Sequence, residues 1–330
     1  EIMPSLVGSE MCIRDSYIGG GTPSYLTPEQ IDFLFNEIKS KFNVENTKQI
    51  MFEVAPSTIT LEKLKVMKRH GVDRITIGVQ SMNEDVLRQQ RRIQTRKQVY
   101  EAYKNARRVG IKYINIDIIA GLRNETLESF IKGLNEVVAL KPDMIYIYPF
   151  DSCGVQFSED NPRLTKEEIK LRYVMSKIGR EILARNGYGT IKHAFLGRTP
   201  DSRNIQETDE LESNSSILGF GTNSRSHAFG TLYYADFSYS TLDNSNMRPN
   251  YCGKTITLKD EMIKFIITNM RQKTLQDDFK RLFNMDITSK FKKEIRQLGI
   301  LGKAYFDGSI LHVNVKNRQE QLVLSKFFYE

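Results

Sequence analysis

The sequence predicts an α/β fold built on a parallel sheet, either most of a (β/α) barrel or a doubly wound sheet. Short apolar stretches rich in β-branched residues recur at intervals of about thirty residues, the size of a βαβ unit. Amphipathic stretches with helical periodicity lie between them. Three consecutive glycines stand where the first apolar stretch gives way to a helix, the position at which such folds bind ligands.

The elements follow one another in a regular order. The first strand enters Gly19, Gly20 and Gly21, and the next helix begins after Thr27, which forms a capping-box pattern with Gln30. Strands are expected at 50–54, 74–79, 113–119 and 144–148, and helices at 28–42, 61–70, 96–109 and 127–140. Short apolar strands that alternate with amphipathic helices predict a parallel sheet with right-handed connections.

Polar residues stand at or near the ends of several predicted strands. Glu53 and Gln80 close two strands, while Asn115 and Asp117 are two residues apart and therefore share one face of a third. A carboxylate in an apolar parallel strand is costly to bury without a partner. We therefore expect these side chains to converge on a polar ligand at the carboxyl edge of the sheet, although any one of them could be a solvated strand end.

Several sequence motifs resemble those of a known family. They are Gly-Gly-Gly-Thr-Pro-Ser at 19–24, Phe-Glu-Val-Ala-Pro at 52–56, Gly-Val-Asp-Arg at 71–74, Gly-Val-Gln-Ser at 78–81, Asn-Ile-Asp-Ile-Ile-Ala-Gly-Leu at 115–122, Gly-Tyr-Gly at 187–189 and Leu-Gly-Phe-Gly at 218–221. In this order the chain resembles the radical S-adenosylmethionine (SAM) superfamily. Within it, the chain is similar to the oxygen-independent coproporphyrinogen III oxidases and their haem-chaperone relatives. The resemblance implies a partial, TIM-like (β/α) barrel with a C-terminal, mainly helical domain.

The resemblance also implies a site for SAM. The glycine edge (Gly19, Gly20, Gly21 and Thr22) would receive its methionine end, and Glu53, Gln80, Arg92 and Asp117 would supply polar contacts. Carboxylates can accept hydrogen bonds from the SAM ammonium or ribose hydroxyls, and a guanidinium can pair with its carboxylate. The role of Arg92 rests on its spacing from Gln80, and this arginine could instead belong to a solvated helix end.

The second cofactor implied by the resemblance is a 4Fe–4S cluster, served by an electron donor. Such clusters are held by a Cys-x-x-x-Cys-x-x-Cys loop. The three cysteines here, Cys12, Cys153 and Cys252, are too far apart in sequence to form it, so we assign no metal ligands. Residues 1–16 match nothing in the family, and we expect them to be a non-native or mis-assembled segment, with the cluster loop and first strand missing. The alternative is a natural clusterless relative that binds SAM or a porphyrin.

The rest of the chain divides into three expected regions. The barrel would span 17–195, a connecting extension 196–255 and the helical domain 256–330. Helices predicted at 260–270, 275–283 and 288–298 precede an Asp-Gly hairpin turn at Asp307, a winged-helix pattern. Because Lys290, Lys292 and Arg296 make this region basic, one alternative is a nucleic-acid-binding module. The other is an amphipathic helix whose solvated face carries the basic residues.

Composition is that of a cytoplasmic protein without a membrane span. The 330 residues carry a net charge of +8, with three scattered cysteines and no apolar run of about twenty residues. We expect a small-molecule substrate, a tetrapyrrole or haem, and do not expect nucleic acid. The resemblance implies reductive SAM cleavage and oxidative decarboxylation of propionates in the intact protein, with a haem chaperone or radical methyltransferase as alternatives. The chaperones' His-Asn-x-x-Tyr-Trp signature is not matched, since the chain has no Trp.

Overall fold

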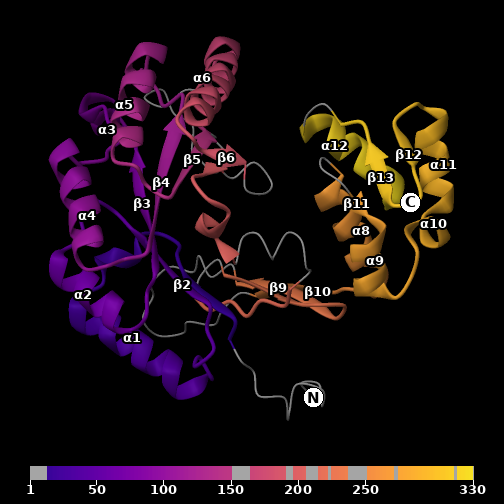
Figure 1. Cartoon of the computed structure of the whole chain (residues 1–330), viewed down its shortest axis with the longest axis horizontal. Coiled ribbons are helices and arrows are strands. Elements are labelled where there is room, and N and C mark those ends of the chain that lie inside the picture. Colours follow the sequence, from indigo (N-terminus) through magenta and orange to yellow (C-terminus); the bar gives the residue numbers. More distant parts are fainter. Residues whose placement is uncertain are drawn as a thin grey trace. The chain divides into compact units, whose positions relative to one another are not determined.

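The computed structural model describes residues 13–150, 164–190, 196–205, 215–221, 224–236, 251–270, 274–315 and 318–329 (Figure 1). The chain divides into two compact units, residues 1–205 and 206–330. The first begins its sheet at Asp15, two residues before the range that we expected for the barrel. Residues 196–205 belong with this unit. The sequence-based domain ranges remain predictions.

The first unit is built on a sheet whose strand order is β1-β2-β3-β4-β5-β7-β6. Its first five strands are parallel, as the βα alternation predicts, and they lie in chain order. These strands are β1 (Asp15–Ile18), β2 (Gln49–Val54), β3 (Arg74–Gln80), β4 (Tyr113–Ala120) and β5 (Met144–Pro149). The short strands β6 (Gly189–Thr190) and β7 (Leu196–Gly197) close the far edge in antiparallel pairing. The prediction of a parallel α/β core is confirmed.

Helices connect the parallel strands and, in Figure 1, run alongside them. The predicted helices appear as α1 (Pro28–Lys41), α2 (Leu61–Arg69), α4 (Arg96–Arg108) and α5 (Leu127–Ala139), joined by α3 (Glu84–Gln89), α6 (Lys166–Arg185) and the single turn η1 (Pro23–Tyr25). The capping box at Thr27 and Gln30 forms as predicted. Across the residues that the model describes, no helix is both long enough and apolar enough to cross a bilayer.

The two faces of the parallel sheet differ in chemistry. One face carries Phe52, Ile75 and Ile116, which are buried in a core shared with helix residues such as Phe130. The strand register places Glu53, Thr76 and Asn115 at one level of the opposite face, with Gly78 and Asp117 at the level above. Side chains alternate along a strand, so these polar residues lie on the face opposite the apolar core. The polar face is the inner face of the partial barrel.

A fully buried arginine closes the amino end of this inner face. The Arg74 guanidinium donates to Asn115 Oδ1 at 2.6 Å and to the carbonyl oxygens of Ser202 and Arg203 at 2.6 and 2.8 Å. Gln49 holds the same segment by accepting from the Ile205 amide at 3.0 Å. The segment 196–205, with its turn η2 (Pro200–Ser202), therefore fills the lower half of the inner face and leaves the polar groups at the carboxyl end as the candidate site.

The second unit combines a small antiparallel sheet with a winged-helix arrangement. The sheet consists of β8 (Arg225–Ala228), β9 (Leu232–Asp236) and β10 (Tyr251–Thr255). The winged-helix part follows in the order α8 (Leu258–Asn269), β11 (Thr274–Leu275), α9 (Gln276–Phe283), α10 (Ile287–Lys290), α11 (Lys292–Ile300), β12 (Ala304–Phe306) and β13 (Ile310–Val313). Its three strands pair in the order β11-β13-β12, as in a winged helix. The unit ends with α12 (Arg318–Ser325) and η3 (Lys326–Phe328). Phe279, Phe291 and Phe328 pack in its core. The first two predicted helices and the hairpin are confirmed, whereas the range predicted as one helix at 288–298 forms two short helices that meet at Phe291.

Candidate functional site

The glycine edge of β1 and the carboxylate of Glu53 form one structure. The Gly20 N–H donates to Glu53 Oε2 at 3.1 Å, and the Tyr17 hydroxyl donates to Glu53 Oε1. A Cβ on Gly19 would overlap the Tyr17 ring and lie 2.9 Å from the Glu53 carboxyl carbon, so both side chains would have to move to accept it. Gly20 and Gly21 have φ values of +81° and +57°, which turn the chain away from the strand. The three glycines thus bring the backbone against a carboxylate.

Gln80 occupies the inner face next to this acid. A Cβ built on Gly78 would lie 3.0 Å from Gln80 Nε2. The absence of a side chain at Gly78 therefore makes space for the Gln80 amide. Gln80 itself has a φ of 65°, which a non-glycine residue rarely adopts. The Gln80 amide is therefore held above Gly78 by an unusual backbone conformation.

Asp117 lies beside the same position on the next strand. It pairs in register with Gly78 on one side and with Tyr146 on the other. Tyr146 is buried, whereas Tyr148, two residues further along the same face, is 45% exposed, and the two rings meet edge to face at 5.9 Å. Glu53, Gln80 and Asp117 thus come from three adjacent strands and gather at the carboxyl half of the inner face.

The two remaining predicted residues lie at the edge of this group. Thr22 begins the turn η1, its carbonyl accepts from the Tyr25 amide at 2.9 Å, and its hydroxyl makes no capping bond. Arg92 is exposed in the loop after α3, where its backbone N–H donates to the Leu87 carbonyl at 2.9 Å. No contact of the Arg92 side chain is recorded within the described ranges. The assignment of all eight residues to SAM stays a prediction.

The residues present fit SAM but not a 4Fe–4S cluster. Two acids, one amide and a glycine backbone that admits close approach match the ammonium and hydroxyl donors of SAM. The three cysteines of the sequence are far apart, and Cys252 is exposed on β10. Within the ranges that the model describes, no three His, Cys, Asp or Glu side chains gather as metal ligands would. No step through a cluster is therefore assigned to these residues.

Comparison with known proteins agrees with this geometry. The model of the Radical SAM superfamily matches residues 7–137. An oxygen-independent coproporphyrinogen III oxidase of Synechocystis sp. is 26% identical over 91% of this chain and 69% of its own length. The haem chaperone HemW of Haemophilus influenzae is 32% identical over 53% of this chain and 46% of its own length.

Residues 7–137 of the chain carry a radical SAM domain. The relatives of the chain include oxygen-independent coproporphyrinogen III oxidases and haem chaperones. The solved structure of coproporphyrinogen III oxidase (HemN) from Escherichia coli superposes with a TM-score of 0.76 at 22% identity, covering 96% of this chain and 77% of that one. The two proteins share a fold, and the prediction of a radical SAM partial barrel is confirmed. The family implies SAM and a 4Fe–4S cluster as cofactors.

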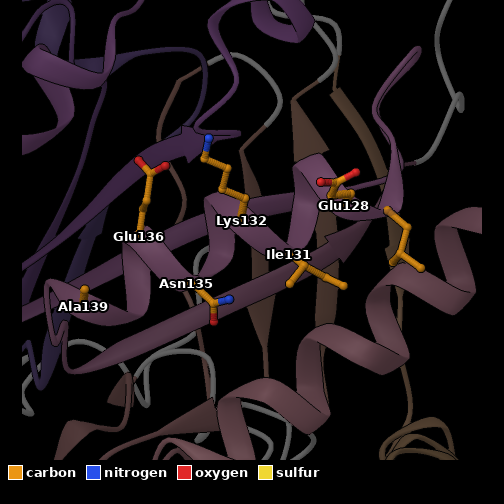
Figure 2. Close-up of a pocket in the computed structure, with 7 residues that line it drawn as sticks. Glu128, Ile131, Lys132, Asn135, Glu136 and Ala139 are labelled. Atoms are coloured by element: carbon orange, nitrogen blue, oxygen red, sulfur yellow. The ribbon is translucent and has the colours of Figure 1, made fainter.

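A second feature of this radical SAM unit is a shallow groove along α5. Figure 2 shows the side chains that line it, all of which come from this one helix: Leu127, Glu128, Ile131, Lys132, Asn135, Glu136 and Ala139. Because α5 packs on the apolar face of the sheet through Phe130 and Leu134, the groove lies on the opposite side from Glu53 and Asp117. It is separate from the candidate SAM site.

Sequence reasoning missed two residues near the site. Tyr17 donates to Glu53, and it could have been found because it precedes Gly19 by two residues and so shares its face. Glu125 is buried beside the end of β3, where it accepts from Ser81 Oγ at 2.7 Å. No sequence signal distinguishes this glutamate from the exposed acids around it.

Proposed function

We propose that this chain binds SAM at the carboxyl end of the inner face. The observation that carries the proposal is the placement of Glu53, Gln80 and Asp117 on neighbouring strands beside a glycine edge. Glu53 would accept from the ammonium group, and Asp117 would accept from the ammonium or a ribose hydroxyl. Each carboxylate oxygen has two lone pairs, so Glu53 can accept further bonds while it holds Tyr17 and Gly20. When bound, SAM would supply the adenosyl group for radical chemistry.

We further propose that the substrate of this radical SAM protein is a tetrapyrrole. The names of its relatives support this class, since they are coproporphyrinogen III oxidases and haem chaperones. The half-exposed ring of Tyr148 at the mouth of the inner face supplies an apolar surface of the kind that a flat macrocycle covers. Oxidation of coproporphyrinogen is the first candidate, and haem binding is the second.

Calorimetric titration of SAM into the chain tests the first proposal. We expect Glu53→Gln and Asp117→Asn each to weaken binding about tenfold or more, because each removes a charged acceptor. Glu62→Gln is the matched control, since Glu62 is exposed on α2. Equal affinities for the wild type, both site variants and the control would place SAM at another site. No detectable binding of SAM to the wild type would reject the proposal.

The substrate proposal is tested separately. Coproporphyrinogen III and haem are titrated anaerobically into the chain and followed by absorbance. A version extended by the cysteine motif is then assayed with SAM for protoporphyrinogen. Release of 5′-deoxyadenosine without protoporphyrinogen would reject the oxidase reaction and retain the superfamily. Haem binding without affinity for coproporphyrinogen would favour the chaperone alternative.

A further inference from the structure

The end of β3 is a strained turn at the candidate SAM site. The Ser81 N–H donates to the Val79 carbonyl at 2.7 Å across Gln80, whose φ is 65°. A bond across a single residue with positive φ is a rare and strained arrangement. The buried Gln94 amide donates to the same Val79 carbonyl. A residue held in such a conformation requires surroundings that stabilise it.

Glu125 provides part of those surroundings. It lies in the loop after β4, and its Oε1 accepts from Ser81 Oγ at 2.7 Å, while Ser81 Oγ accepts from the Asn83 amide at 3.2 Å. Glu125 is only 4% exposed. Its contacts are this hydroxyl and the backbone amides of Gly121 and Leu122, with no charged side chain among them in the described part of the chain. The second carboxyl oxygen, Oε2, is buried without a hydrogen-bond partner there.

We propose that Glu125 is a positioning residue: through Ser81 it braces the strained turn that presents the Gln80 amide to SAM. The inference rests on the proposed SAM site. The bond joins Ser81, the residue that follows Gln80 at the end of β3, to the loop after β4, the strand that carries Asp117. This bond thus fixes the relative position of two groups that would contact one ligand.

The protonation state of Glu125 affects this hydrogen-bonded contact with Ser81, which we call the brace. Burial raises the pKa of this carboxyl to about 7, because the dry surroundings disfavour its charged form. Below that pH the neutral carboxyl stays buried beside Ser81. Above it, the charged and incompletely paired carboxylate favours opening of the two loops to water. SAM affinity is therefore expected to decline as pH rises from the ordinary carboxyl value of 4.5 to about 7, and to level off above it.

The test compares SAM affinity at about pH 5 and about pH 8 in matched variants. Glu125→Gln keeps an oxygen that accepts from Ser81 but cannot ionise. Glu128→Gln is the control, since it makes the same change at an exposed position three residues later. We expect the wild type and Glu128→Gln to lose affinity about threefold to tenfold over this range, and Glu125→Gln to keep it within about twofold. The same pH profile in all three proteins would overturn the proposal.

Hydrogen exchange separates this inference from the proposed function. Ser81→Ala should lower the protection of amides 79–83 by about tenfold, whereas Ser176→Ala, at a buried serine on α6, should not affect them. If no variant binds SAM at either pH, the proposed function fails. Loss of protection in Ser81→Ala would still support the brace, and unchanged protection there would reject it.

Discussion

The glycines at the end of β1 have different roles, although they are consecutive. Gly19 faces the Glu53 carboxyl, and any side chain there would displace that acid. Gly20 and Gly21 have positive φ values, and no atom lies within 4 Å of a Cβ built on either of them. Gly19 is therefore needed to leave space for the Glu53 side chain, whereas Gly20 and Gly21 are needed for the left-handed backbone conformation.

Alanine at each position should separate these roles. Gly21→Ala is expected to cost about 1 kcal/mol of folding free energy, because an L-residue must adopt the left-handed region. Gly19→Ala is expected to weaken SAM binding by more than about tenfold, because Glu53 and Tyr17 must move. Denaturant unfolding and calorimetric SAM titration measure the two effects. A Gly19→Ala protein that binds SAM normally would contradict the role assigned to this glycine.

Helices α1 and α2 are joined at their surface by a charged and hydrogen-bonded group. Asp32 on α1 contacts Arg69 and His70 Nε2, both at 2.8 Å, and His70 Nδ1 lies 3.1 Å from Lys39 Nζ. An ammonium can only donate, so His70 Nδ1 accepts and Nε2 carries the proton toward Asp32. His70, which follows α2, also stacks on Phe35 of α1 at 5.1 Å. The group thus links the helices that follow and precede β2.

Because of this contact, we expect the free energy of unfolding to depend on pH in the acid range. The bonds from His70 and Arg69 lower the pKa of Asp32 to about 2. The stabilisation is present above the unfolded pKa, near 4, and is lost as pH falls toward 2. Asp32→Asn should therefore flatten the dependence of the denaturation midpoint between these pH values. Asp85→Asn, at an exposed aspartate on α3, is the control, and equal curves for both variants would contradict the assignment.

At the scale of the whole molecule, the net charge of +8 and the winged-helix arrangement raise the question of nucleic acid. Helix α11 exposes Lys292, Lys293 and Arg296 while Leu298 faces the core. This is the pattern of an amphipathic helix with a solvated basic face.

We therefore expect only weak, non-specific association with DNA. Fluorescence anisotropy with two duplexes of unrelated sequence should give equal affinities that fall steeply as salt rises, because phosphate contacts alone contribute. Lys292→Glu with Lys293→Glu should weaken both equally. Salt-resistant binding to one duplex and not the other would instead support a nucleic-acid-binding function for the second unit.

The alternation of strands and helices along the chain, the glycine edge and the face shared by Asn115 and Asp117 could all be predicted from the sequence. These features depend on local periodicity and on the backbone freedom of glycine, so they can be predicted from neighbouring residues alone. Tertiary packing was needed to show that Arg74 is buried against residues 202–203, that the Gln80 amide lies over Gly78, and that Glu125 is buried. Burial and hydrogen-bond partners depend on which distant segments pack together, so an exposed and a buried glutamate read alike until the chain is folded.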